Sequence, residues 1–388
     1  MRSVRNPGGN PMREEDFPVL QNREVTYLDS ACMSLRPERV IQSVEKYYRD
    51  LSSCPGRSSH KLGRETGDRI NKARATVSDF IDAGHKDIAF TSGTTEALNL
   101  AAKAFSNMNV VVSDKEHNSN LVPWQKNNID VLKTDDGIDL QALSEKVDEN
   151  TVVSLHHKSN IDGSELPVEE ISEIVHEKNG YLVVDAAQSI SHRPVSVNEI
   201  NPDVLAFSGH KMFGPSGTGV LYVSDRAKEL FRNVKTGGGA VKNTTFQEAE
   251  FKSFPSCVEA GLPNAAGIIG LGTAVEYIEE VGIGEIESHE QKLSRLIRQK
   301  TREIEGLKIV GDHGTGVFSF SFDNVGAHQV SEMLDRKDIA VRSGRHCVHS
   351  WFNSRDIEPS FRASLHMYNT EEDIERLFEV LKQISVLN

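Results

Sequence analysis

The sequence predicts an α/β fold in which helices cover both faces of a mainly parallel β-sheet. Short apolar runs recur along the chain, as expected of strands that are buried on both faces. Segments with helical periodicity separate most of these runs. Polar residues follow the ends of several runs, and ligands of open α/β sheets bind at the carboxyl ends of the strands.

The expected strands and helices alternate along the first two thirds of the chain. Strands are expected at residues 87–91, 109–113, 151–155, 181–184, 204–207 and 219–223. Helices are expected at residues 96–105, 139–147 and 167–178. A long helical pattern then begins after Gly261-Leu262-Pro263-Asn264 and leads out of the large lobe.

The last third of the chain mixes helices with strands such as residues 316–321. The final helix is expected to begin after Thr370, because Asp373 three residues later completes a capping pattern. An apolar stripe with helical spacing follows and is expected to be core: Ile374, Leu377, Phe378, Leu381 and Ile384. A chain of 388 residues can bury a large core, and we expect two lobes.

Composition and charge favour a cytoplasmic protein. The chain has 44 Lys and Arg against 57 Asp and Glu, and this formal charge of -13 argues against nonspecific binding to nucleic acid or to acidic membranes. No apolar run approaches the roughly 20 residues of a membrane span. The first ten residues lack the apolar segment of a secretory signal. The four cysteines are widely spaced and are expected to be reduced.

Two polar motifs at the ends of neighbouring strands carry the first chemical signal. Asp185 follows the strand at 181–184 in Asp-Ala-Ala-Gln, and Lys211 follows the strand at 204–207 in Ser-Gly-His-Lys. Both residues are therefore expected at the ligand-binding edge of the sheet. The pair suits pyridoxal phosphate, which forms a Schiff base with a lysine and pairs its pyridinium nitrogen with an aspartate.

Other strand ends deliver residues to the same edge. Gly93-Thr94-Thr95 opens a helix, and its N–H groups and hydroxyls suit a phosphate, although the segment is also an ordinary helix start. His117 follows the strand at 109–113 and has a flat ring that can stack on a pyridine. Four further polar residues follow strand ends: Asn160, Gln188, Ser208 and His210. Singly each is unremarkable, but together they predict one site.

Several motifs resemble those of a known enzyme family. They are Glu116-His117, Asp185-Ala186-Ala187-Gln188, Ser208-Gly209-His210-Lys211, Phe213-Gly214-Pro215 and Ala260-Gly261-Leu262-Pro263-Asn264. These motifs are similar to those of the class V aminotransferase and cysteine desulfurase family, which are fold-type I pyridoxal-phosphate enzymes. The likeness extends over nearly the whole chain, from Tyr27 to Thr370.

The resemblance implies a domain organisation and an assembly. We expect an N-terminal segment at 1–28 that packs with the small domain. A large cofactor-binding domain with a seven-stranded sheet is expected at 29–277, and a smaller α+β domain at 278–388. In this family the site lies at the interface of a homodimer, to which the partner contributes the Gly237-Gly238-Gly239 segment.

The resemblance also implies roles for the cofactor residues. Lys211 is the Schiff-base lysine, Asp185 keeps the ring nitrogen protonated, and His117 stacks on the ring. Gln188 binds the phenolic oxygen. The phosphate is bound by Thr94, Thr95, Ser208 and His210. Once released, Lys211 can act as the base at the substrate carbon.

A cysteine in the last third selects the reaction. The segment Arg342-Ser343-Gly344-Arg345-His346-Cys347 is similar to the loop of group II cysteine desulfurases. Arg345 and His346 are expected to favour the Cys347 thiolate, which is the form that attacks sulfur. Two alternatives stay open: a small buried hydrophobe, or a metal ligand with His346 and His349. The spacing is cramped for a metal, so no metal is expected.

Four residues are expected to bind the substrate. Arg362 matches the arginine of the family that binds the substrate carboxylate, a task that suits a guanidinium fork, although an ordinary surface arginine is the alternative. Arg57 matches another active-site arginine. Arg342 and Asn160 complete this set.

The chain departs from the family pattern at three positions. Gly56 and Arg345 stand where group II enzymes have histidines, and Leu262 stands where the family has a threonine. The first two changes are close to the expected sulfur chemistry. The third removes a hydroxyl that the partner would offer to the phosphate.

The leading hypothesis is a cysteine desulfurase that acts on L-cysteine. It predicts L-alanine and a persulfide on Cys347 as products, with transfer of the sulfur to an acceptor protein for iron–sulfur cluster assembly. The alternatives are a class V aminotransferase or selenocysteine lyase, and a noncatalytic sulfur-transfer scaffold. The intact Lys211 and Asp185 argue against the scaffold.

Overall fold

The computed structural model describes residues 14–56, 59–134, 137–311 and 314–386. Its central sheet has seven strands: β2 (Ile88–Thr91), β3 (Asn109–Ser113), β4 (Ile129–Leu132), β5 (Thr151–His156), β6 (Tyr181–Asp185), β7 (Val204–Ser208) and β8 (Gly219–Val223). Their order is β2-β8-β7-β6-β5-β3-β4. Strands β7, β6, β5, β3 and β4 are parallel, whereas β8 runs antiparallel to both β2 and β7. The predicted mainly parallel sheet is confirmed.

Helices flank this sheet as the alternation predicted. They are α1 (Pro18–Asn22), α2 (Glu38–Asp50), α3 (Lys61–Phe80), α4 (Thr94–Ala104), α5 (Asn118–Leu121), α6 (Leu140–Lys146), α7 (Val168–Glu177) and α8 (Val197–Ile200). The three helices predicted in this region correspond to α4, α6 and α7, with ends that differ by one or two residues. The sequence pattern did not predict α2, α3 or β4.

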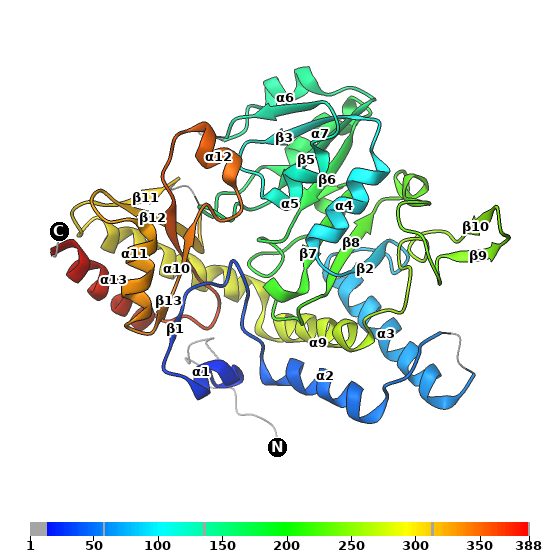
Figure 1. Ribbon diagram of the computed structural model, residues 1–388, viewed down its shortest axis with the longest axis horizontal. Coiled ribbons are helices and arrows are strands. Elements are labelled where there is room, and N and C mark those ends of the chain that lie inside the picture. Colours follow the sequence, from blue (N-terminus) through cyan, green and yellow to red (C-terminus); the bar gives the residue numbers. More distant parts are fainter. Residues whose placement is uncertain (1–13, 57–58, 135–136, 312–313, 387–388) are drawn as a thin grey trace.

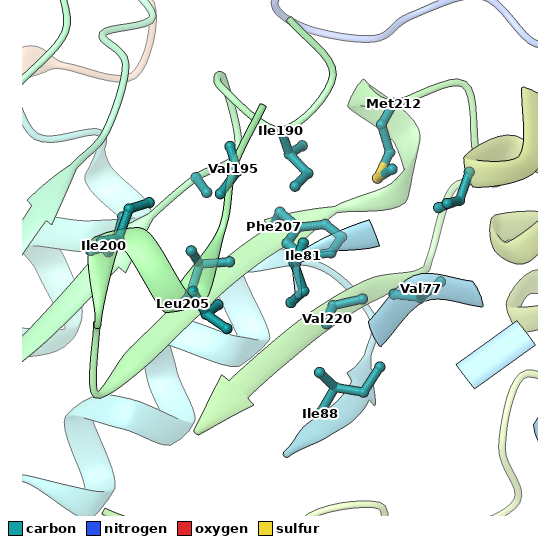
Figure 2. Close-up of a cluster of buried hydrophobic side chains, with 14 of the residues drawn as sticks. Val77, Ile81, Ile88, Ile190, Val195, Ile200, Leu205, Phe207, Met212 and Val220 are labelled. Atoms are coloured by element: carbon teal, nitrogen blue, oxygen red, sulfur yellow. The ribbon is translucent and has the colours of Figure 1, made fainter. Parts of the chain in front are cut away.

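Two apolar layers hold the helices against the sheet, because successive side chains of a strand point to opposite faces. On β7, Leu205 and Phe207 belong to the layer that includes Val77 of α3. Figure 2 shows this layer in close-up. Val204 and Ala206 belong to the opposite layer, where α4 packs. This burial on both faces explains why the strand appears in the sequence as a continuous apolar run.

A second, four-stranded sheet lies in the last third of the chain. Its antiparallel strands are β11 (Leu307–Val310), β12 (Val317–Phe322), β15 (Ser360–Ser364) and β14 (Arg342–Gly344), in that order. Helices α9 (Ala265–Val281) and α10 (Ile283–Thr301) carry the chain to it from the central sheet (Figure 1). Helices α11 (Ala327–Asp335), α12 (His349–Ser354) and α13 (Glu371–Val386) complete this region.

The predicted start of the final helix is confirmed. The Asp373 N–H donates to Thr370 Oγ1 at 3.0 Å, and the Thr370 N–H donates to an Asp373 carboxylate oxygen at 2.9 Å. These reciprocal bonds satisfy N–H groups that a helix start leaves unpaired. The predicted apolar stripe of α13 is buried in the core of the second sheet.

A short N-terminal strand joins this second region. Strand β1 (Thr26–Tyr27) pairs in parallel with β13 (Ile339–Ala340), and Asp29 forms a bridge with Ser364. The chain then turns from β15 toward the central sheet. Residues 1–13 of the N-terminal segment at 1–28 lie outside the described residues, and the domain limits at 29–277 and 278–388 stay predictions.

A hairpin of β9 (Val241–Thr244) and β10 (Ala249–Phe251) projects away from the body of the molecule (Figure 1). Phe246 at its tip is fully exposed. Within the described ranges, none of the helices has both the length and the apolar character needed to cross a bilayer.

Candidate active site

A cavity with an empty volume of about 830 Å³, partly open to solvent, lies at the carboxyl ends of the parallel strands. It is lined by all the predicted site residues except two: Thr94, Thr95, His117, Asn160, Asp185, Gln188, Ser208, His210, Lys211, Arg342, Cys347 and Arg362. Arg57 lies outside the described residues. Gly238, which was predicted to act in the partner's site, does not line the cavity of its own chain.

Asp185 and Lys211 lie at the floor of the cavity because β6 and β7 are parallel neighbours. Asp185 ends β6, and Lys211 ends a helical turn that follows β7. Burial raises the pKa of Asp185, opposed by the charge of Lys211 and by the Ala187 N–H. Burial likewise lowers the pKa of Lys211, opposed by Asp185. A lowered pKa leaves more of the neutral amine, which is the nucleophile that forms a Schiff base.

A close approach of two glycines positions the helix start predicted to bind phosphate. A Cβ on Gly219 of β8 would lie 2.5 Å from the Cα of Gly93, so only glycine allows this contact. The start of α4 therefore reaches the end of β7. There the Thr94 N–H donates to Ser208 Oγ at 2.8 Å, and the two hydroxyls lie 2.7 Å apart. A helix N-terminus with clustered hydroxyls fits a phosphate.

Three more residues complete the cofactor end of the cavity. Thr95 Oγ1 lies 2.7 Å from Ser119 Oγ, and Ser119 is a cavity residue that was not predicted. Burial, together with the charges of Lys211 and Arg36, lowers the pKa of His210 to about 4, so its ring is neutral at pH 7. Gln188 Nε2 donates to the carbonyl oxygen of Ala31 at 2.7 Å.

His117 presents a neutral ring to the cavity. Burial and the charges of Lys211 and Arg362 lower the pKa of His117 to about 3. Its Nδ1 accepts the Ser119 N–H at 3.0 Å, and this fixes the ring proton on Nε2. The ring is therefore an uncharged flat surface with a defined orientation, as stacking on a pyridine requires.

A buried ion pair lies behind Asp185 and was not predicted. His156 on β5 is in register with Asp185 on β6, and its Nδ1 lies 2.8 Å from Glu116 Oε1. Burial raises the pKa of Glu116, but the charge of His156 and three side-chain hydrogen bonds outweigh it, so the pKa is lowered. The pKa of His156 is raised by Glu116 against the effect of burial. In the sequence, the only signal for His156 was its place directly after the predicted strand at 151–155.

Cys347 also lines the cavity, in a loop after β14. His346 and Cys347 both have left-handed backbones, with φ of 45° and 59°. Such conformations are strained in residues other than glycine. Two hydrogen bonds of 2.7 Å hold them: the Asn118 N–H donates to the Cys347 carbonyl, and Asn160 Nδ2 donates to the His346 carbonyl.

The predicted charge around Cys347 is partly wrong. Burial and the charges of Arg362 and Arg342 lower the pKa of His346 to about 3, so His346 is neutral at pH 7. Its Nε2 contacts Ser360 Oγ at 2.8 Å. Arg345 is exposed and does not line the cavity. The positive charge of the cavity instead comes from residues that include Arg342, Arg362 and Lys211.

Arg362 is a buried residue rather than a surface arginine, since only 2 % of it is exposed. Its Nη2 lies 3.1 Å from an Asp29 carboxylate oxygen, and its Nη1 donates to the Asn160 carbonyl at 3.0 Å. Among the described groups its Nε has no partner, although it is buried. A buried donor without a protein partner fits a site that binds an anionic ligand.

Two further residues of the cavity were missed. Cys32 follows β1 and faces the cavity, where Arg342 Nη1 donates to its sulfur at 2.6 Å. Lys158 follows β5 and is buried beside the cavity, 3.5 Å from Glu165. Cys32 follows a strand of only two residues, so the sequence pattern carried no signal for it. Lys158 does follow a predicted strand, at 151–155, and this signal was not used.

The strand-end lysine and aspartate, the neutral histidine and the phosphate-type helix start together define the class of pyridoxal-phosphate enzymes of fold-type I. The family model described as Aminotransferase class-V matches residues 26–377. The chain therefore belongs to the class V aminotransferase family, whose members use pyridoxal phosphate, and the resemblance seen in the motifs is confirmed.

Within this family the chain is similar to cysteine desulfurases over nearly its whole length. It is 36% identical to a probable cysteine desulfurase of Halalkalibacterium halodurans, over 95% of this chain and 96% of that protein. It is 34% identical to a cysteine desulfurase of Escherichia coli O8, with the same coverage. The apo structure of a cysteine desulfurase from Thermococcus onnurineus superposes with a TM-score of 0.93 at 32% identity, covering 100% of both chains.

Proposed function

We propose that this protein is a cysteine desulfurase that uses pyridoxal phosphate to convert L-cysteine to L-alanine and a persulfide on Cys347. One observation carries the proposal: Cys347 faces the same cavity as Lys211 and Asp185. The similarity to cysteine desulfurases over 95% of the chain supports it.

The cavity residues fit the cofactor. Lys211 would hold its aldehyde carbon, Asp185 its ring nitrogen, and His117 would lie against its ring. The start of α4 and the Ser208 hydroxyl would bind its phosphate. When bound, pyridoxal phosphate supplies an electron sink that acidifies the Cα proton of the substrate.

The protein's own residues then divide the reaction between them. Arg362 binds the substrate carboxylate through its free Nε and so orients Cα toward Lys211. Lys211, whose pKa burial lowers, accepts the Cα proton as a neutral amine. Asn160 holds both Arg362 and the loop of Cys347, so it couples substrate position to the thiol.

Cys347 takes the sulfur as a thiolate. Its sulfur attacks the substrate sulfur, an S–S bond forms, and the Cβ–S bond breaks with its electron pair retained on Cβ. Protonation of that carbon gives alanine, and the removed sulfur stays on Cys347 as a persulfide. No oxidant is required, because the electrons of the broken bond leave with the alanine.

The proposal extends to the assembly and partners. The enzyme is a cytoplasmic homodimer in which Gly238 of one chain completes the phosphate site of the other. An acceptor protein receives the sulfur for iron–sulfur cluster assembly. Selenocysteine, with the same carbon skeleton, would react by the same route.

Product analysis tests the proposal. Purified holoenzyme is incubated with L-cysteine and a reducing thiol, once without and once with a keto acid, and the amino acids are separated. We expect alanine and sulfide in both reactions and no amino acid derived from the keto acid. Amination of the keto acid without sulfide would instead establish an aminotransferase. The Cys54→Ser variant is the matched control, because Cys54 is exposed and does not line the cavity.

A further inference from the structure

Two thiols face the cavity, and the proposed function uses only one of them. Cys32 and Cys347 both line the cavity and both are partly exposed. The other two cysteines do not line it, since Cys54 is exposed elsewhere and Cys257 is buried in the core. All four are free thiols. A second free thiol within a site that handles sulfur has a direct chemical use.

The backbone around Cys32 is fixed from two directions. The Ala31 N–H donates to Ser364 Oγ of β15 at 2.9 Å, and the Ala31 carbonyl accepts from Gln188 at 2.7 Å. Cys32 itself closes a turn by donating its N–H to the Asp29 carbonyl at 3.1 Å. These bonds tie the turn both to the second sheet and to the cofactor end. They hold the Cys32 side chain at the cavity wall.

The charges around Cys32 suit a sulfur anion. Arg342 Nη1 donates to the Cys32 sulfur at 2.6 Å, and a guanidinium is a permanent positive charge. Lys211 lies within electrostatic reach of both Cys32 and Cys347. Both a thiolate and a persulfide anion on Cys32 would therefore have a cationic donor in contact. The next residue, Met33, is 40% exposed, so the turn borders solvent.

The loop of Cys347 is the part of the cavity wall whose backbone is strained. The backbone carbonyls of its two left-handed residues, His346 and Cys347, each accept one hydrogen bond, from Asn160 and Asn118. The His346 ring also contacts Ser360 Oγ at 2.8 Å. Because the conformation is strained, release of these bonds favours other backbone geometries. The turn of Cys32 is fixed, so a shift of this one loop changes the separation of the two sulfurs.

We infer that Cys32 is a second sulfur-carrying residue, which accepts the outer sulfur of the persulfide on Cys347; this inference rests on the proposed function. The Cys32 thiolate attacks the outer sulfur, and a new S–S bond forms on Cys32. The bond between that sulfur and Cys347 breaks, and its electron pair leaves on Cys347 as a thiolate. One thiolate and one persulfide are present before and after, so no oxidant or reductant is consumed. Cys347 is then ready for another substrate while Cys32 holds the sulfur.

The test follows sulfur on both cysteines over time. Holoenzyme is mixed with about two equivalents of L-cysteine per chain and no other thiol, and is quenched with an alkylating reagent. The Cys32 and Cys347 peptides are then weighed by mass spectrometry. We expect an added sulfur on Cys347 first and on Cys32 later. In the Cys347→Ser variant neither peptide gains sulfur. This time course on the unaltered enzyme does not depend on any variant folding.

The Cys32→Ser variant allows a second measurement, the amount of alanine that each chain forms before sulfur is released. Serine is close in size and can still accept the hydrogen bond from Arg342. The first burst of alanine is expected to fall from about two equivalents per chain to about one, because only one thiol then stores sulfur. The Cys54→Ser variant keeps the full burst.

Each other outcome has a distinct meaning. Sulfur on Cys347 alone in the unaltered enzyme overturns the relay and leaves the proposed function intact. Sulfur on Cys32 in the Cys347→Ser variant also overturns it, since Cys32 would then attack the substrate directly. A disulfide between Cys32 and Cys347 with released sulfide overturns it as well. Sulfur on neither cysteine of the unaltered enzyme contradicts the proposed function itself.

Discussion

The two ends of the cavity are built from different kinds of structure. The cofactor end lies on the edge of the central sheet, where Asp185 and Lys211 follow neighbouring parallel strands. The sulfur end consists of the turn at Cys32, the loop at Cys347 and the pair of strands β14 and β15. The cofactor end is fixed by the strand ladder of the central sheet. At the sulfur end, Arg342 and Arg362 lie on a ladder, whereas Cys32 and Cys347 lie on irregular backbone that individual hydrogen bonds hold in place.

This difference matches the chemistry that we assign to each end. Ring, phosphate and aldehyde must stay in place during the reaction, and a sheet edge supplies fixed positions. The sulfur must be taken up and passed on, which requires a group that can move. A family of enzymes can therefore keep the cofactor end and change its reaction at the sulfur end.

Replacing Lys211 should have the largest effect. This residue acts at the cofactor end, and the sulfur chemistry at the other end depends on the cofactor. In Lys211→Ala we expect alanine formation to fall by about 10²–10⁴-fold or more, since the base at Cα is lost. Borohydride reduction should attach the cofactor to the unaltered chain and not to the variant.

The matched control is Lys158→Met, which removes the other buried lysine of the cavity. This variant should still be labelled by the reduced cofactor. Labelling of the Lys211→Ala variant would contradict this assignment, because another lysine would then hold the cofactor. Loss of labelling in the Lys158→Met variant would contradict it as well.

Arg362→Lys should affect the sulfur end and spare the cofactor end. Lysine keeps the charge but loses the fork that contacts Asp29, Asn160 and the substrate. A lost hydrogen bond to a charged group costs about 1.5–3 kcal/mol, so kcat/KM for L-cysteine should fall about 10- to 150-fold. The absorbance of the bound cofactor should not change.

Arg345→Lys is the control for this prediction, because Arg345 is exposed and lies outside the cavity. Its kcat/KM should match that of the unaltered enzyme. An unchanged kcat/KM in Arg362→Lys would mean that charge alone, rather than the buried fork, binds the substrate. An equal loss in Arg345→Lys would mean that the effect is not specific to the cavity.

Asn160 contacts both Arg362 and the loop of Cys347, and one variant can remove the second contact while it keeps the first. Asn160→Asp keeps the carbonyl contact with Arg362 but cannot donate to His346. Loss of one such bond is worth about 0.5–1.5 kcal/mol, and the rate of persulfide formation on Cys347 should fall about 2- to 12-fold. Rapid-quench mass spectrometry would measure it. An unchanged rate would show that this bond does not position the loop.

Low pH should lower the free energy of unfolding, and this is the smallest of the expected effects. Burial lowers the pKa of His117, His157 and His346 to about 3 in the folded chain. Below the unfolded value near 6.5, the unfolded chain therefore binds more protons, and stability falls as pH falls. Each group contributes about 1.4 kcal/mol per pH unit there.

Urea unfolding of the cofactor-free protein at pH 7.5 and pH 5.5 measures this effect. The midpoint should be lower at pH 5.5. Glu290 acts in the opposite direction, because burial raises its pKa to about 7 and its protonation favours the folded state. A midpoint that rises on acidification would mean that Glu290 outweighs the histidines.

The cofactor end was predictable from the strand pattern itself. At the sulfur end, Cys347, Arg342 and Arg362 were predicted only through the resemblance of their segments to the family, and Cys32 was missed. Asp185 and Lys211 each follow an apolar run whose burial on both faces is visible as a pattern. Cys32 follows a strand of two residues, and its place depends on the pairing of Thr26 with Ile339. Such long-range pairing leaves no local periodicity.

Burial explains the incorrect expectation for His346. A histidine beside a cysteine suggests positive charge, yet desolvation keeps this ring neutral, and the sequence does not show how deeply a loop residue is buried. The pairing of Arg342 with Arg362 across β14 and β15 was equally invisible. The cap at Thr370 was predictable because its two partners are three residues apart.

The division between the two ends is tested most directly by weighing the Cys347 peptide after brief exposure to L-cysteine, in the unaltered enzyme and in Cys347→Ser. We predict one added sulfur atom in the unaltered enzyme and none in the variant. The variant should retain the full absorbance of bound cofactor, because the cofactor end is intact. Alanine formation at the full rate in Cys347→Ser, or loss of the cofactor from it, would contradict the account.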